Sequence, residues 1–170
     1  NGLVKACEIC EKQNARLLIF GLSFDYYENG EIYRKDELIY PEKDPLSPSQ
    51  WAKDFEGLFQ HNALSSACNK IFEASVIQEN SIFFNKDIFL MEDFLFVLQY
   101  LKHVETIHFL PEAIYRYRHT DDDTHAFLRA GRVSDLNSYL KPFCNSIEEL
   151  AASLKDKHNI DFTEGERVLF

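Results

Sequence analysis

The chain has 170 residues, of which 45% are hydrophobic and 27% charged, and its net charge is −10. This length allows one domain, or one domain with an appendage, and it is enough to bury a substantial core. The acidic balance argues against nucleic acid as the main partner, because phosphate binding needs surplus lysine and arginine. No apolar run in the sequence approaches the roughly 20 residues that a membrane-spanning helix needs.

Both ends of the sequence resemble cuts through a longer protein. The first residues carry neither an initiating methionine nor a signal-peptide pattern, and the last four residues end the chain without a polar tail. Cys7 and Cys10 have the spacing of half a zinc site, but no second pair follows. Because Leu3, Cys7 and Cys10 would share one helix face, we interpret both thiols as reduced core residues. We therefore expect a cytoplasmic protein, with a peripheral position at the inner face of the membrane left open.

The first hundred residues alternate between helical and strand patterns. Helical periodicity precedes a short apolar run that is typical of a strand buried on both faces. An Asn-Gly turn at 29–30 between β-prone runs predicts a hairpin. The expected elements, in chain order, are a helix over 2–14, a strand at 15–20, hairpin strands at 24–27 and 31–35, a proline-rich loop at 41–49, a helix over 50–60, a short strand within 62–72, and helices over 73–79 and 92–103.

The remaining residues predict two strands and a helical end. Strand-like runs at 106–110 and 113–118 are separated by Pro111 and Glu112, and helical periodicity from 131 to 158 predicts a break near Pro142. We expect one α/β domain over 1–120 and a helical extension over 121–170.

An acidic pair, Glu92 and Asp93, interrupts the apolar run at 89–98. A carboxylate in such a setting is costly unless it is paired, capped or open to a cleft. One interpretation is that the pair begins a helix, where carboxylates complement the positive end of the helix dipole. The other is that the helix start faces a cleft, in which a carboxylate acts as a general base. The local pattern leaves both interpretations open.

Three basic side chains also allow two interpretations each. Lys70 stands among small residues, either as a surface lysine or as part of a site. Arg116 and Arg118 would share one face of a strand, as an anion clamp or as solvated side chains. The acidic stretch 119–125 is interpreted as a solvated loop, because adjacent aspartates cannot all aim at one metal ion.

Four segments carry a family resemblance. Residues 69–72 (Asn-Lys-Ile-Phe) resemble the Trp-Asn-Lys-Leu-Tyr strand of family 2 glycosyltransferases, and 83–94 resemble the block of that family that ends in Glu-Asp. Residues 111–119 are similar to its closing strand, and 2–20 to the segment after its Asp-x-Asp metal motif. Residues 3–118 thus resemble the second half of such an enzyme. The implied fold is α/β, a partial GT-A-like mixed sheet flanked by helices, as in nucleotide-diphospho-sugar transferases, with a C-terminal helical extension.

The sequence departs from the family pattern at three places. Cys68 replaces the aromatic residue that usually precedes Asn-Lys, and three aspartates follow His119 where asparagine and serine are commoner. No nucleotide-binding strands and no Asp-x-Asp motif precede Asn1. A fragment that lacks half of its sheet would expose strand edges and apolar surface, so a homo-oligomer is left open.

The resemblance implies sugar transfer from a nucleotide-sugar donor to a glycan or lipid-linked acceptor hydroxyl, in surface polysaccharide or glycan biosynthesis. Asp93 matches the position of the catalytic base, with Glu92 as its partner and as the expected helix cap. Lys70, Arg118 and His119 are candidates for binding the diphosphate or the acceptor. A divalent metal, Mg²⁺ or Mn²⁺, is implied, with its ligands mostly outside this chain. The alternative is a non-catalytic binding or assembly module derived from the same fold, which an upstream Asp-x-Asp motif would argue against.

Overall fold

The computed structural model describes residues 2–120, 133 and 135–163. Its helices and strands, in chain order, are α1 (Gly2–Gln13), β1 (Leu17–Glu28), β2 (Glu31–Leu38), α2 (Pro48–Lys53), α3 (Phe55–Gln60), β3 (Lys70–Phe72), α4 (Ala74–Glu79), α5 (Glu92–Leu101), β4 (His108–His119) and α7 (Leu136–His158). Among these described residues, no helix combines the length and the apolar character needed to span a bilayer.

β1 is the strand to which the other three strands pair. β2 and β3 pair with it antiparallel, β2 along its second half and β3 along its first residues, while β4 runs parallel to it. The predicted hairpin is confirmed, and its turn holds Asn29 and Gly30 at φ values of 51° and 84°. The expected gap between strands at 20 and 24 is wrong. The strand continues through Gly21 because glycine has no side chain. A Cβ at this position would lie only 2.6 Å from the Leu38 carbonyl oxygen on β2.

β4 is also one strand, although two were expected. The interruption at Pro111 and Glu112 survives as a bulge, since Phe20 pairs with Leu110 and the next residue of β1, Gly21, pairs with Ala113. A proline is tolerated at such a bulge because no ladder hydrogen bond needs its missing N–H there.

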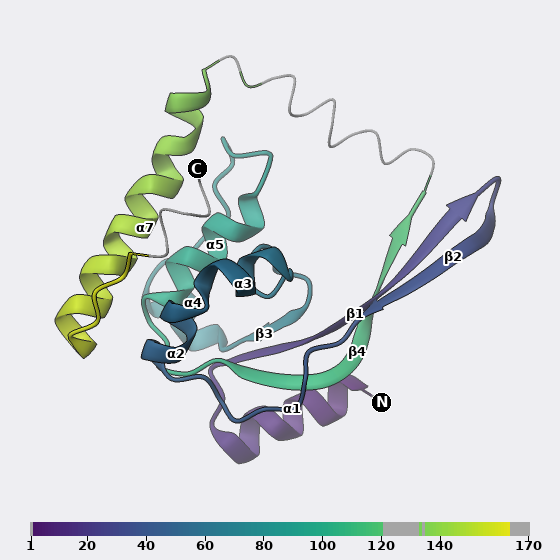
Figure 1. Cartoon of the computed structure of the whole chain (residues 1–170), viewed down its shortest axis with the longest axis horizontal. Coiled ribbons are helices and arrows are strands. Elements are labelled where there is room, and N and C mark those ends of the chain that lie inside the picture. The colour runs from purple at the N-terminus through teal and green to yellow at the C-terminus, as the bar shows by residue number, and fades with distance from the viewer. Residues whose placement is uncertain (1, 121–132, 134, 164–170) are drawn as a thin grey trace.

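Two apolar clusters cover opposite faces of the first half of the sheet (Figure 1). On one face α1 packs Ala6 against Leu18, Phe20 and Leu110. On the other face lies the larger core, in which α5 is central: seven of its ten residues are buried. α7 packs alongside α5 through Phe143, Ile147, Leu150 and Leu154. The division into domains at residue 120 stays a prediction.

Three expectations about the helices are corrected. The expected helix over 50–60 is divided into α2 and α3 at Asp54. α7 passes through Pro142 without ending, with Asp135 as its N-terminal cap. In α1 the buried position is Ala6, whereas Leu3 is 57% exposed and Cys7 is exposed, so the expected apolar face was misplaced around the helix.

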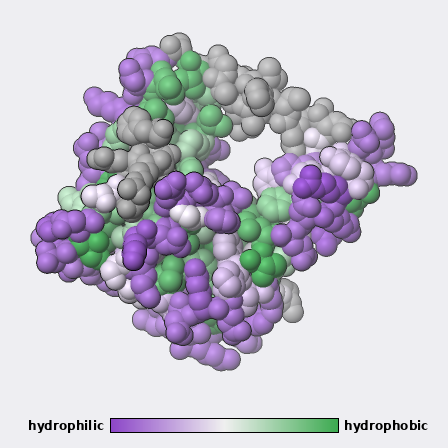
Figure 2. Space-filling model, viewed as in Figure 1, coloured by the Kyte–Doolittle hydropathy of each residue, from purple (hydrophilic) through white to green (hydrophobic). Residues whose placement is uncertain are grey.

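The second halves of β1 and β4, together with β2, extend past the helices as a three-stranded projection, which we call the arm (Figure 1). Its strand residues are those from 22 to 38 and from 115 to 119. The arm stands away from the helical body and its visible surface is mostly hydrophilic (Figure 2). The body therefore holds the core, whereas most strand residues of the arm are exposed or half-buried.

Candidate functional site

The acidic pair marks the start of α5, as the sequence predicted. The N-terminal cap is Met91, which has a left-handed backbone at φ 63° and makes no side-chain cap hydrogen bond. Met91 accepts instead through its carbonyl oxygen, from the Leu95 N–H at 3.2 Å. The expectation that Glu92 caps the helix is wrong, because Glu92 is already the first helical residue. Both carboxylates lie in the first turn, where the helix dipole favours negative charge.

Asp93 is half-buried and is held by a loop far away in the sequence. Its Oδ2 accepts a hydrogen bond from the Ala67 N–H at 2.9 Å. Within the described part of the chain, its second oxygen, Oδ1, has no hydrogen-bond partner. A carboxylate with one oxygen fixed and the other available has the geometry that a general base needs.

Lys70 lies beside this carboxylate at the first position of β3, and it is only 8% exposed. Its ammonium donates to the backbone oxygen of Ser66 and to Asn69 Oδ1, the latter at 2.7 Å. Burial lowers the pKa of Lys70 to about 7, and Cys68 and Asp93 oppose that shift. The interpretation of Lys70 as a surface lysine is therefore wrong: the pairing of β3 with β1 carries its side chain into the interior.

Asn69 extends the same network toward the middle of the sheet. It is fully buried, and its Nδ2 donates to the Tyr40 hydroxyl and to the Asn62 carbonyl oxygen, each at 3.1 Å. The Tyr40 hydroxyl donates in turn to the His61 carbonyl oxygen at 2.9 Å. Burial raises the pKa of Tyr40, so the phenol keeps its proton at neutral pH. The loop from 61 to 70 is thus held by its own side chains and by Tyr40.

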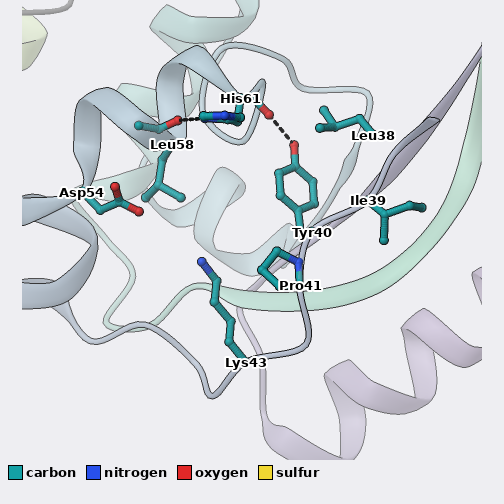
Figure 3. Close-up of a pocket in the computed structure, with 9 residues that line it drawn as sticks. Leu38, Ile39, Tyr40, Pro41, Lys43, Asp54, Leu58 and His61 are labelled. Atoms are coloured by element: carbon teal, nitrogen blue, oxygen red, sulfur yellow. Dashed lines mark hydrogen bonds between the residues drawn. The ribbon is translucent and has the colours of Figure 1, made fainter. Parts of the chain in front are cut away.

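The outer side of Tyr40 lines a pocket with a volume of about 250 Å³. Figure 3 shows Tyr40 reaching toward His61, with Lys43 and Asp54 directed into the same space. The floor is apolar, with Leu38 and Leu58 among its residues. This pocket and the Asp93 carboxylate are connected through Tyr40, Asn69 and Lys70.

The other two candidates, Arg118 and His119, lie at the far end of the arm. The Arg118 guanidinium sits over the Tyr27 ring at 4.1 Å, and His119 stacks on Tyr26 with ring centroids 4.7 Å apart. On β1, Ile19 pairs with Lys70 and Tyr26 pairs with His119. Lys70 and His119 are therefore seven residues apart as counted along β1. At about 3.3 Å per residue this is roughly 23 Å. The structure brings Lys70 and Asp93 together and leaves Arg118 and His119 elsewhere.

The two arginines that the sequence allowed either as an anion clamp or as solvated side chains have separate partners. Arg116 is 71% exposed and its Nε lies 3.5 Å from Asp25 Oδ2, an oxygen that is buried and has no hydrogen-bond partner among the described residues. Arg118 faces Tyr27 instead. Each guanidinium therefore has its own neighbour on the arm.

No group of three histidine, cysteine, aspartate or glutamate side chains that could hold a metal ion occurs within residues 2–120, 133 and 135–163. The resemblance implies a divalent metal whose ligands lie mostly outside this chain, and that expectation stays a prediction. Most of the acidic stretch, 121–125, lies outside the described residues.

Sequence reasoning missed Tyr40, Ser66 and Ala67. Ser66 and Ala67 act through backbone atoms, which no side-chain pattern reveals. The run of small residues from 65 to 68 was the available signal, because small side chains allow a backbone to turn closely around an ammonium.

Comparison with known proteins identifies the fold. No protein-family model matches the chain, and no curated protein sequence matches it. Among solved structures, Staphylococcus aureus TarS 1–349 aligns with a TM-score of 0.52 at 13% identity, and its complex with UDP with a TM-score of 0.51 at 14% identity. Each alignment covers 99% of this chain and 40% of the TarS chain.

TarS is a glycosyltransferase, and this chain spans less than half of its length. At these identities the likeness concerns the fold alone. The mixed sheet with helices on both faces agrees with it. The chain therefore has a glycosyltransferase-like α/β fold that corresponds to part of a GT-A-like domain.

Proposed function

We propose that this chain is the acceptor-side part of a family 2 glycosyltransferase, with Asp93 as the catalytic base. The observation that carries the proposal is the state of the Asp93 carboxylate: one oxygen accepts from the Ala67 N–H, and the other has no partner among the described residues. The carboxylate also lies at the start of a buried helix, within a fold like that of TarS. The resemblance in sequence suggests Asp93, and the likeness in fold to TarS supports the class of enzyme.

The proposed reaction is transfer of a sugar with inversion at its anomeric carbon. The acceptor hydroxyl gives its proton to Oδ1 of Asp93, and its oxygen forms a bond to the anomeric carbon. The bond from that carbon to the diphosphate oxygen breaks, and the nucleoside diphosphate leaves with the electron pair. A hydroxyl is a weak nucleophile, and general-base assistance of this kind contributes about 10²–10⁴-fold.

The nucleotide and the metal would be bound mainly outside this chain. One TarS structure is a complex with UDP, which supports a nucleotide-sugar donor. When bound, a divalent metal such as Mg²⁺ or Mn²⁺ would stabilise the charge of the leaving diphosphate. The proposed acceptor is a glycan or a lipid-linked sugar in surface polysaccharide synthesis.

The first test is Asp93→Asn in the longer protein to which we propose that this chain belongs, assayed with a panel of UDP-sugars and glycan acceptors. We expect transfer to fall by about 10²–10⁴-fold, because the amide cannot take the proton. Circular dichroism and thermal unfolding check that the fold is kept. Glu148→Gln, at an exposed carboxylate on α7, is the matched control and should retain most of the activity. Transfer at the wild-type rate by Asp93→Asn would refute the assignment of the base.

The second test uses the 170 residues alone. We expect no turnover of UDP-sugars, because the described residues build no metal site and the chain covers 40% of TarS. Titration calorimetry with UDP, in the presence and absence of Mn²⁺, should show no tight binding. Tight, metal-dependent binding of UDP would contradict the proposal that the nucleotide and the metal are bound mainly outside this chain.

A further inference from the structure

Lys70 is a buried cation whose hydrogen bonds all return to its own loop. Its ammonium donates to the Ser66 carbonyl oxygen, four residues earlier, and to the side chain of its neighbour Asn69. These two bonds close a ring over residues 66–70. The Cys68 N–H donates to Ser66 Oγ at 3.3 Å, which tightens the same turn.

The residue at the tip of this turn is Ala67, and its N–H is the group that holds Asp93. The direction of a backbone N–H is set by the turn around it. In this turn Lys70 binds the carbonyl oxygen of Ser66, which belongs to the same peptide group as the Ala67 N–H. A backbone donor aimed at a carboxylate oxygen fixes the orientation of the whole carboxylate, including the oxygen that remains available.

We propose that Lys70 is a positioning residue for Asp93: its ammonium clamps the Ser66–Lys70 turn so that the Ala67 N–H holds Oδ2, which leaves Oδ1 directed at the acceptor hydroxyl. This inference rests on the proposed role of Asp93 as the base. It replaces the expectation that Lys70 itself contacts the diphosphate, since the ammonium is buried and engaged.

The electrostatics of the cluster agree with this role. A buried ammonium is costly unless carbonyl oxygens and an opposite charge compensate for its lost hydration. Two oxygens are supplied by the turn, and Asp93 supplies negative charge from α5. The buried Asn69 amide, fixed by Tyr40 and Asn62, presents its oxygen to the ammonium. The lysine is thus held on several sides, as a clamp must be.

The test is amide hydrogen exchange, followed by NMR, in the 170-residue chain carrying Lys70→Met. We expect exchange at Ala67 to accelerate by about tenfold or more, since the turn opens locally, after correction for any change in global stability. Leu58, whose N–H donates to Asp54 in α3, serves as an internal reference and should change by less than about twofold. Lys102→Met, which removes a lysine paired with Glu149, is the matched control and should leave Ala67 unchanged. Unaltered protection of Ala67 in Lys70→Met would overturn the proposal.

A second measurement does not use Lys70→Met, so it can be made even if that variant fails to fold. In protein labelled with ¹³C at lysine Cε, the titration of Lys70 is compared between the wild type and Asp93→Asn. Because Asp93 raises the pKa of Lys70, replacing Asp93 with a neutral residue should move the titration of Lys70 to lower pH. Identical titration curves would contradict the coupling. Neither readout depends on sugar transfer, so a failure here and a failure of the proposed function are distinguishable.

Discussion

The body and the arm share β1, yet their basic side chains are placed differently. In the body, Lys70 and Asn69 are buried and connected to Asp93 and Tyr40 by a chain of hydrogen bonds. In the arm, Arg116 and Arg118 are exposed, and each has one separate neighbour. The difference arises because helices cover the first half of the sheet and leave the second half open (Figure 1).

This contrast predicts where substitutions couple to one another. Buried polar groups depend on every partner, because an unsatisfied group keeps its full desolvation penalty. Exposed groups exchange a lost partner for water. The body should therefore respond to single changes strongly and non-additively, and the arm weakly and additively.

The largest expected effect is the pH dependence that Lys70 gives to the body. The pKa of Lys70 falls from 10.5 to about 7 on burial. Between these values the unfolded chain holds a proton that the folded chain lacks, so stability should rise as the pH increases from about 7 toward 10. Below about pH 7 both states are protonated, and the full cost of the buried charge is present.

Lys70→Met should remove this rise. As the pH increases, the free energy of unfolding of the wild type should rise relative to that of the variant by on the order of a few kcal/mol. Urea unfolding from pH 6 to pH 9 measures it, below the range in which the buried phenols of Tyr40 and Tyr100 begin to ionise. Parallel curves for the two proteins would show that Lys70 is not buried as described.

The second effect concerns Asn69, and its expected size is about 3 kcal/mol of lost stability in Asn69→Leu. The substitution keeps roughly the same volume but removes the donor to Asn62 and the acceptor for the Lys70 ammonium. Chemical denaturation at neutral pH measures the loss. Asn137→Leu, an exposed site on α7, is the matched control and should cost less than about 0.5 kcal/mol. Equal effects at the two sites would contradict the distinction between a connected body and open surface.

The sequence predicted the features that depend on neighbouring residues. The Asn-Gly turn identified the hairpin, and the acidic pair identified the start of α5. Contacts between distant segments were not accessible. Lys70 is buried because β3 pairs with β1 and because α5, more than twenty residues later, lies against the same loop.

Long-range pairing also decided which candidates meet. Arg118 and His119 are the last residues of β4, a strand whose length the sequence did not reveal. Gly21 and the bulge at Pro111 let β1 and β4 continue past the body. The expected gaps at these residues would have kept both strands short. The resemblance to a known family suggested Asp93 as the base, and the three-dimensional structure places Asp93 in the body, away from the arm.

The smallest expected effect is at Arg118, and it tests the independence of the arm. Arg118→Ala removes the guanidinium from the Tyr27 ring, a contact worth about 0.5–1 kcal/mol at an exposed site. Because roughly 20 Å of β1 separates the residues that pair with Arg118 and with Lys70, the effect of Arg118→Ala on stability should add to that of Asn69→Leu within about 0.5 kcal/mol. Urea unfolding of the two single variants and the double variant measures the coupling. A coupling above about 1 kcal/mol would mean that β1 transmits strain between arm and body, and Arg118 would then have to be considered together with the Asp93 site after all.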